Sequence, residues 1–480
     1  MLETTSRTFK DNAARELANA DLQKALATAE GHFVDGRQAA VDKLPEFDAL
    51  RDRAVEIKNQ VLANLDYYLE MFEANVQRAG GTVHWARNAA EAQQIVLDIC
   101  RSVNATSVNK GKSMISEECG INDMLEENGI RPVETDLGEY IIQLRGETPS
   151  HIIAPAVHVT KAQVEESFRE THKDLDPGRN LDEPTALLGE ARAVLREKYF
   201  QAEVGITGAN FLVAETGSSI IVTNEGNGDL SQLIPRVHIA MASIEKVVPT
   251  LEDTATLLRL LARSATGQEF SSYTTLSTGP KRPGDPDGPE QYHVILLDNG
   301  RSAMLGSEFQ EMLRCIRCGA CMNHCPVYQA VGGHAYGWVY PGPMGAVLTP
   351  SLIGVEEGGQ LPNASTFCGR CEEVCPMRIP LPKLMRHWRN REYEGHLSPG
   401  SYRAGLGLWA FFARRPALYR FATGLQTRVM KRLAGGRGRL RSLPLAGGWT
   451  KYRDLPAPEG RTFQAMWAER QKTQAAGGGR

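Results

Sequence analysis

Seven of the nine cysteines in this 480-residue chain lie close together in the sequence, between positions 315 and 375. The first four form the pattern Cys-x2-Cys-x2-Cys-x3-Cys-Pro, made of Cys315, Cys318, Cys321, Cys325 and Pro326. This is the spacing of the bacterial ferredoxin run, in which three thiolates bind one iron–sulfur cluster and the fourth binds a neighbouring cluster. The spacing therefore predicts iron–sulfur chemistry, which is the transfer of electrons.

The other three cysteines form a second, shorter group. It reads Cys-x2-Cys-x3-Cys-Pro over Cys368, Cys371, Cys375 and Pro376, and Ser365 stands where a complete motif would have its first cysteine. Crossed ligation between the groups predicts two sites. Site 1 takes Cys315, Cys318, Cys321 and Cys375. Site 2 takes Cys325, Cys368 and Cys371, and it has an open corner near Ser365.

We expect a [4Fe-4S] cluster at site 1 and either a [4Fe-4S] or a [3Fe-4S] cluster at site 2. The corner near Ser365 could hold a serine oxygen, a water or an outside ligand, or it could be empty. Zinc is the alternative for Cys-x2-Cys pairs, but two zinc ions would need eight ligands and no Cys-x3-Cys-Pro element. His324 lies inside the first group, and we expect it either beside the cluster or exposed to solvent, rather than on iron.

Motifs for other kinds of redox or catalytic chemistry are missing. No Gly-x-Gly-x-x-Gly links a strand to a helix, so we find no flavin or nicotinamide site. No nucleophile arrangement is legible, and Cys100 and Cys119 are expected to be small buried side chains. Hydroxy-acid oxidation would need a hydride acceptor, which this sequence does not show. We therefore interpret the chain as a non-catalytic electron-transfer subunit of an oxidoreductase, with substrate chemistry in a partner or at the open corner.

The sequence divides into four regions. Residues 1–60 form a helical N-terminal segment, residues 61–300 an α/β domain, residues 301–394 an α-helical ferredoxin, and residues 395–480 a basic region with a disordered end from Ala475. The 42 residues between Cys325 and Cys368 favour helices that connect the two cysteine groups. In this respect the segment resembles the iron–sulfur subunits of succinate dehydrogenase-type enzymes.

The α/β domain is predicted from apolar stretches that alternate with helical patterns. Expected strands cover Thr82–Trp85, residues 151–159, Ser219–Thr223 and His293–Asp298, and an amphipathic helix covers Ala89–Arg101. Strands alternating with helices indicate a largely parallel sheet that is covered on both faces.

A few polar positions in this domain could bind a ligand. Lys110 and Lys112 flank a glycine after an expected strand, and polar turns occur at Glu215–Ser218 and Asn224–Gly228. Strand ends of this kind bind ligands in α/β folds, although ordinary turn chemistry is the simpler interpretation. Three histidines in or near apolar stretches are expected to be hydrogen-bonded core residues: His151, His158 and His238.

The C-terminal region is strongly basic. Residues 395–453 contain twelve Lys and Arg and no Asp or Glu. Aromatic side chains accompany the arginines in Leu406–Pro416 and Ala417–Phe421, which suits a helix on an anionic membrane surface or an acidic partner protein. A basic surface that docks onto the acidic remainder of the chain is equally compatible. No recognition motif accompanies the charge, so nucleic-acid binding is not expected.

Charges run through residues 1–30, so no signal peptide is predicted. No stretch approaches 18 apolar residues, the least expected of a membrane-spanning helix. We therefore expect a cytoplasmic protein that can associate with a membrane through its basic region. In a reducing compartment, clustered cysteines are metal ligands more often than disulfides.

With these motifs in place, nearly the whole chain resembles the lactate utilization protein B family, the iron–sulfur subunits of a three-protein bacterial lactate oxidation system. Besides the cysteines, the most specific stretches are Val133–Gln143, Pro149–Pro155, Glu215–Ser218, Thr223–Asn227 and Trp449–Pro456. The resemblance implies an α/β lactate-utilization domain related in fold to sugar-phosphate isomerases and CoA transferases. It also implies oxidation of L-lactate to pyruvate by a complex whose other subunits include one iron–sulfur protein and one that shares the α/β domain.

Two alternatives stay open. An open iron corner is labile, so the chain could be a cluster-based redox sensor or a scaffold protein. The same electron relay could also serve another 2-hydroxy acid, such as glycolate, because no substrate-contacting residue is identified.

Overall fold

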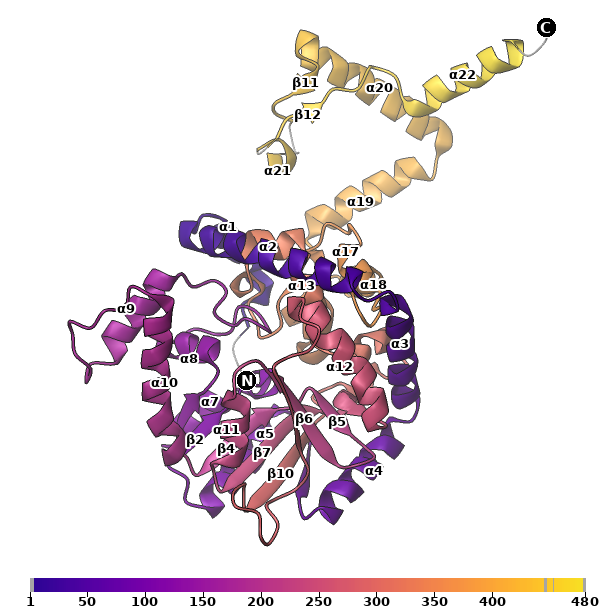
Figure 1. Cartoon of the computed structure of the whole chain (residues 1–480). Coiled ribbons are helices and arrows are strands. Elements are labelled where there is room, and N and C mark those ends of the chain that lie inside the picture. Colours follow the sequence, from indigo (N-terminus) through magenta and orange to yellow (C-terminus); the bar gives the residue numbers. More distant parts are fainter. Residues whose placement is uncertain (1–3, 444–446, 452, 478–480) are drawn as a thin grey trace. The chain divides into compact units, whose positions relative to one another are not determined.

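A six-stranded parallel sheet organises the α/β part of the chain (Figure 1). The computed structural model describes residues 4–443, 447–451 and 453–477, and the strand order is β1-β10-β7-β4-β2-β3. The strands are β1 Thr82–Ala86, β2 Ser107–Lys110, β3 Arg131–Glu134, β4 Val204–Gly208, β7 Val237–Ser243 and β10 Gln291–Leu297. The chain runs outward from β2 to β3, but from β4 through β7 to β10 in the opposite direction. This reversal between β2 and β4 is the kind of position where open α/β sheets bind ligands.

Helices cover both faces of this sheet. On β7, Ile239 and Met241 pack with α5 (Ala89–Ser102), α6 (Met114–Cys119) and α7 (Ile121–Glu127). The alternate residues Ala240 and Ala242 belong to a second core on the opposite face, with α4 (Leu65–Arg78). Successive side chains of a strand point to opposite faces, so a strand buried on both faces must be apolar throughout. The predicted parallel sheet with two covered faces is confirmed.

A smaller mixed sheet lies in the order β8-β5-β6-β9. Its strands are β8 Val247–Val248, β5 Phe211–Val213, β6 Ser218–Thr223 and β9 Tyr273–Ser277, and α12 (Leu251–Thr266) contacts β5 and β8. Three predicted strands are therefore present, because Thr82–Trp85 lies in β1, Ser219–Thr223 in β6 and most of His293–Asp298 in β10.

The predicted strand over residues 151–159 is wrong. The segment consists of bends and turns, and it pairs with no strand. The backbone folds around its own first side chain, since His151 Nδ1 accepts the N–H groups of Ile153 and Ala154, both at 3.0 Å. A proline at position 155 also removes a donor that a central strand would need.

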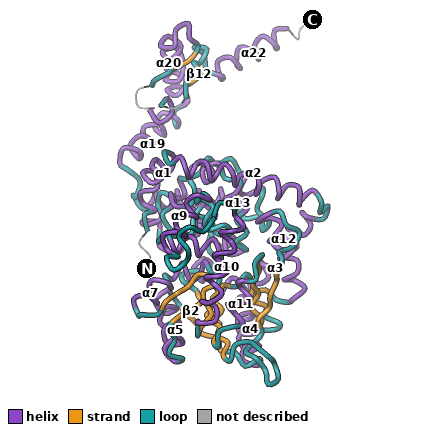
Figure 2. The backbone as a smooth tube through the Cα atoms, turned by 60° about the vertical axis from the view of Figure 1, so that its left-hand side comes forward, coloured by secondary structure: helices purple, strands orange, loops and turns teal. Residues whose placement is uncertain are grey.

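The N-terminal helices pack on the cysteine-rich part of the chain. They are α1 Phe9–Leu17, α2 Ala20–Asp42 and α3 Phe47–Ala63. Those of the cysteine-rich part are α13 Ala320–Asn323, α14 Pro326–Val331, α15 Gly342–Ile353, α16 Val355–Gly358, α17 Arg370–Glu373 and α18 Leu381–Glu394. Helix α2 contacts α13 and α14, and Figure 2 shows the strands gathered well below α1, α2 and α13. The predicted α-helical ferredoxin is confirmed.

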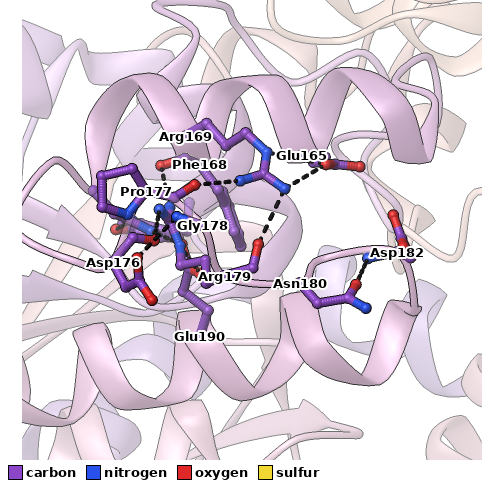
Figure 3. A network of polar contacts seen from close by, with 12 residues as sticks. Glu165, Phe168, Arg169, Asp176, Pro177, Gly178, Arg179, Asn180, Asp182 and Glu190 are labelled. Carbon is purple, nitrogen blue, oxygen red and sulfur yellow. Dashed lines mark hydrogen bonds and ion pairs between the residues drawn. The ribbon is translucent and has the colours of Figure 1, made fainter.

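Four further helices belong to the α/β part of the chain: α8 (Leu137–Leu144), α9 (Lys161–Thr171), α10 (Pro184–Gln201) and α11 (Asn227–Leu233). Two arginines close the loop between α9 and α10 (Figure 3). Arg179 Nε lies 2.6 Å from Glu190 Oε2, and Arg169 donates to the carbonyls of Pro177 and Arg179 at 3.3 and 3.2 Å. These contacts fix a loop that carries few apolar side chains of its own.

Residues His396–Arg480 form a separate compact unit. It contains α19 Gly400–Ala413, α20 Pro416–Ala434, α21 Gly447–Thr450, α22 Phe463–Gly477 and a short pairing of β11 Arg439–Leu440 with β12 Leu455–Pro456. The disordered end was expected from Ala475, whereas α22 continues to Gly477 and residues 478–480 lie outside the described part. Among the described residues, no helix is both long and apolar enough to cross a membrane.

Candidate metal centre

The two cysteine loops have the same backbone conformation, 50 positions apart. Arg317 and Phe367 have φ values of 60° and 56°, although neither is a glycine. Gly319 and Gly369 follow with φ values of 75° and 85°, and each begins a short helix, α13 or α17. A non-glycine residue with positive φ is uncommon, so its occurrence at equivalent positions shows that the second group is a structural repeat of the first.

This repeat makes Ser365 the equivalent of Cys315. The sulfur of Cys315 accepts the N–H of Arg317 at 3.4 Å. In the second loop, the hydroxyl oxygen of Ser365 accepts the N–H of Phe367 at 3.1 Å. The two side-chain atoms therefore take part in the same turn, one as sulfur and the other as oxygen.

Cysteines from both loops line one small cavity in the first unit. Its lining includes Cys315, Cys318 and Cys321 from the first loop and Cys375 from the second. The remaining wall is apolar and includes Ile152, Met344 and Ile379. These four cysteines are the set predicted for site 1.

Thiolates of the cavity repel one another. Burial raises the pKa of Cys321 well above its ordinary value, and the thiolates of Cys315, Cys318 and Cys375, followed by that of Cys371, raise it further. Burial likewise raises the pKa of the Cys375 thiol to about 11. Thiols that resist ionisation at neutral pH must release their protons to solvent when they bind metal as thiolates.

The three cysteines predicted for site 2 also interact with one another. Burial raises the pKa of Cys371 to about 12, and the thiolates of Cys325 and Cys368 contribute to the increase. Cys325 and Cys371 are buried, but Cys368 is exposed to solvent. The N–H of Arg370 and the hydroxyl of Thr366 lower the pKa of Cys368. This set therefore reaches the surface of the first unit.

The described thiols are not gathered as they would be around a single metal ion. A tetrahedral zinc ion holds each thiolate at about 2.3 Å. Within residues 4–443, 447–451 and 453–477, no three His, Cys, Asp or Glu side chains lie close enough together to bind one ion. Four thiols around one cavity nevertheless fit a larger iron–sulfur cluster, which holds each thiolate on a different iron.

Arginines from outside the cysteine groups support these loops, and the sequence did not predict them. Arg51 of α3 donates to the carbonyl of Cys375 at 2.8 Å, and to that of Glu373 at 2.9 Å. Arg37 of α2 donates to the carbonyl of Val374 at 3.0 Å. Both side chains are buried. They hold the second loop in place and add positive charge beside the thiolates.

A buried chain of ion pairs connects the first cysteine loop to the sheet. Glu118 of α6 accepts two hydrogen bonds from Arg301, at 2.9 and 2.6 Å. Arg301 lies 3.2 Å from Glu245, and Glu245 lies 3.3 Å from Arg317, between Cys315 and Cys318. Burial opposes ionisation of Glu245, but Arg301 and Arg317 outweigh it and lower its pKa to about 2. Tyr340 also donates to Glu118, at 2.7 Å.

The two lysines singled out from the sequence have different surroundings, and Lys112 is the one that lines the cavity described below. Lys110 is fully buried and forms ion pairs with Glu117 and, at 2.7 Å, with Glu134. It therefore holds α6 and β3 against β2. Lys112 donates to the carbonyl of Ile153 and lines a cavity with Asn224 and Glu225 of the second polar turn. The other turn, Glu215–Ser218, lies against α4 instead, where Asn75 donates to the carbonyl of Glu215 at 3.1 Å.

The four histidines singled out from the sequence, His151, His158, His238 and His324, each have a hydrogen-bond partner within the protein. His151 Nε2 bonds to Asn323 of α13 at 2.8 Å, and burial lowers the pKa of His151 to about 4. His238 bonds to Thr207 at 2.8 Å, and His158 bonds to Glu147 at 2.7 Å. His324 Nδ1 donates to the carbonyl of Ala320 at 2.9 Å. Cys100 and Cys119 are buried in the core, as expected.

Comparisons with known proteins agree with this architecture. Family models match residues 69–297 as a LUD domain, residues 311–379 as a 4Fe-4S dicluster domain, and residues 391–472 as the C-terminal part of lactate utilisation protein B. The dicluster match indicates iron–sulfur clusters rather than zinc.

Full-length relatives are found in several bacteria. Lactate utilization protein B of Bacillus licheniformis is 42% identical over 97% of each chain, and that of Lysinibacillus sphaericus is 41% identical over 98% of each. An uncharacterized electron transport protein of Escherichia coli is 39% identical over 99% of this chain and 100% of its own. Because this identity extends over the sheet, the cysteine loops and the basic region alike, the chain belongs to the lactate utilization protein B family.

Proposed function

We propose that this chain is the iron–sulfur electron-transfer subunit of a complex that oxidises L-lactate to pyruvate. The observation that carries the proposal is the cavity in which Cys375 joins Cys315, Cys318 and Cys321. It supports a [4Fe-4S] cluster at site 1 and a second cluster, [4Fe-4S] or [3Fe-4S], at site 2. When bound, such clusters supply reversible one-electron transfer.

The protein's own residues give the two sites different environments. Site 1 is lined by apolar side chains and faces the sheet through Arg317. Site 2 includes the exposed Cys368, so it can be approached from solvent. Burial and nearby charge both tune cluster potentials. We therefore propose that electrons enter at site 1 and leave towards an acceptor or another subunit through site 2.

The names of the relatives support the proposed substrate and partners. Proteins of similar length are named for lactate utilization, and one is named for electron transport. We propose that the partners are the other lactate-utilization subunits, one of them an iron–sulfur protein and one sharing the α/β domain. One alternative is that the same electron relay serves a complex that oxidises glycolate or another 2-hydroxy acid. The other is that the chain is a cluster-based redox sensor or a scaffold protein.

The first prediction tests the relay. Protein reconstituted with iron and sulfide under anaerobic conditions should show reducible clusters by electron paramagnetic resonance. L-lactate should reduce them only when partner subunits are present, because this chain is proposed to transfer electrons and not to oxidise lactate. Reduction of the isolated chain by lactate would contradict the relay assignment. Unchanged partner activity with both Cys318→Ser and Cys371→Ser would favour the sensor or scaffold.

A second prediction tests crossed ligation. Cys375→Ser should change the same cluster signal as Cys318→Ser, although it is closer in sequence to Cys371. Cys325→Ser and Cys371→Ser should both change the other signal, because each removes a thiolate from site 2. Cys100→Ser, which removes a buried thiol outside both sets, is the control and should leave both signals intact. The assignment fails if Cys375→Ser and Cys371→Ser affect the same cluster.

A third prediction concerns the open corner. Ser365→Cys should favour a conventional four-iron cluster at site 2 and lower its reduction potential, because an added thiolate brings negative charge. Spectroscopy and redox titration of that cluster would measure the change. Ser102→Cys places a thiol on the exposed end of α5 and is the control. An identical spectrum and potential in Ser365→Cys and the unmodified protein would count against Ser365 at this corner.

We propose further that the basic C-terminal helices contact an anionic membrane surface. On α20 the exposed apolar side chains recur every four residues, at Phe421, Leu425, Val429 and Leu433, with exposed fractions of 70%, 51%, 48% and 66%. Arg420 and Arg428 accompany this stripe. An apolar stripe beside basic residues is typical of helices that lie in a membrane interface.

This proposal predicts binding of the full chain to vesicles that contain anionic lipid and not to neutral vesicles. Replacing Arg420 and Arg428 with Gln removes about 2 kcal/mol of attraction, at about 1 kcal/mol per charge, so affinity should fall roughly thirty-fold. Co-sedimentation measures it. The control replaces Arg53 and Arg236, two exposed arginines of the first unit. Equal binding to neutral vesicles, or no binding, would leave an acidic partner protein as the better candidate.

A further inference from the structure

A cavity of about 220 Å³ lies at the carboxyl edge of the parallel sheet. Residues that follow three of the parallel strands line it: Lys112 after β2, Gly208 at the end of β4, and Lys246 after β7. It therefore lies at the reversal in strand order between β2 and β4, where ligands bind in open α/β sheets. Apolar side chains, among them Ile221 and Leu261, form much of the wall.

Lys246 is the exceptional residue of this cavity. It is only 6% exposed, and it has neither a hydrogen bond nor an ion pair to its ammonium group within the part of the chain that the structure describes. Burial lowers the pKa of Lys246 to about 7. Lys58, equally hidden, differs because it donates to the backbone carbonyls of Glu245 and Val247. A buried charge without a partner is costly, so an anion in the cavity would be stabilising.

The charge around Lys246 also favours an anion. Four cations with little or no exposed surface gather with two buried carboxylates among the described residues at this edge. The cations are Lys58, Lys246, Arg301 and Arg317, and the carboxylates are Glu118 and Glu245. The lining of the cavity itself carries three cations, Lys112, Lys246 and Arg317, and two carboxylates, Asp136 and Glu225, which leaves one excess positive charge to attract an anion.

The cavity adjoins the predicted position of the first cluster. Arg317 and Ile152 line both this cavity and the one formed by the site 1 cysteines. Lys246, however, lines only the sheet-edge cavity. Lys246 therefore lies on the ligand side of the wall that Arg317 and Ile152 share with the site 1 cavity.

We propose that this cavity binds a small carboxylate, of the 2-hydroxy or 2-oxo acid class, with the carboxylate held by Lys246. The inference rests on the proposed function and extends it, because it places a substrate or product of the complex on this chain, beside site 1. A volume of 220 Å³ is below the range usual for drug-sized ligands, and the apolar wall suits the short carbon chain of such an acid.

Calorimetry on the full chain, reconstituted with iron and sulfide under anaerobic conditions, tests the proposal. L-lactate and pyruvate should bind, whereas lactamide, which has the shape of lactate without its charge, should bind at least ten-fold more weakly. Lys246→Met should weaken lactate and pyruvate binding by about ten-fold or more, the usual loss for a charge-assisted hydrogen bond. Absence of carboxylate binding, or equal binding of lactamide, overturns the proposal. Equally tight binding of inorganic phosphate overturns the carboxylate assignment.

Two further variants distinguish a direct contact between Lys246 and the ligand from a general effect of positive charge and from unfolding of the protein. Lys58→Gln removes an equally buried charge that does not line the cavity, so it should weaken binding much less; equal weakening overturns a direct contact by Lys246. Ala265→Leu fills the cavity and leaves Lys246 in place, so it should also abolish binding; unchanged affinity overturns the location. Dithionite-reduced cluster signals, recorded on each variant, report the proposed electron relay independently of ligand binding.

Discussion

The buried ion-pair chain from Glu118 through Arg301 and Glu245 to Arg317 is the interaction on which the rest of the structure depends. It joins α6, the carboxyl end of the sheet and the first cysteine loop through one chain of buried ion pairs. Removing one partner of a buried ion pair leaves an uncompensated charge, at a cost of about 3–5 kcal/mol. The α/β domain and the cysteine-rich part therefore cannot move independently without exposing or orphaning a charge, and this keeps the sheet-edge cavity next to site 1.

The repeat of the two cysteine loops explains both their similarity and their difference. Equivalent positive φ values and equivalent short helices show that the two loops have the same backbone conformation. The difference lies at the first position, where Cys315 has sulfur and Ser365 has oxygen in the same turn. Exposure adds a second difference, because only the loop with the serine carries an exposed cysteine. Chemically distinct ends are what a directional electron path requires.

The parts that sequence predicted are those in which residue type and local spacing decide the outcome. The ferredoxin spacing predicted which cysteines line a common cavity, and β1, β6 and β10 were visible as apolar stretches. The strand predicted over residues 151–159 was wrong because an apolar composition also suits a buried turn. The hydrogen bonds from the N–H groups of Ile153 and Ala154 to the His151 ring stabilise the turn. Arg37, Arg51 and Lys246 could not be found from spacing, since their importance comes from contacts with residues far away in the chain. The largely apolar strand β7, which ends shortly before Lys246, was a local signal that could have pointed to Lys246.

The contacts of α2 and α3 with the second cysteine loop have a consequence for biogenesis. Arg37 and Arg51 bind carbonyls of residues 373–375, more than 300 positions later in the chain. Contacts of such long sequence separation form slowly, because closing a long loop costs entropy before the contact compensates for it. During synthesis, Arg37 and Arg51 cannot make these contacts until nearly the entire first unit has been translated. A ferredoxin fragment cut free at residue 301 would therefore lack Arg37 and Arg51, which hold its second loop in place.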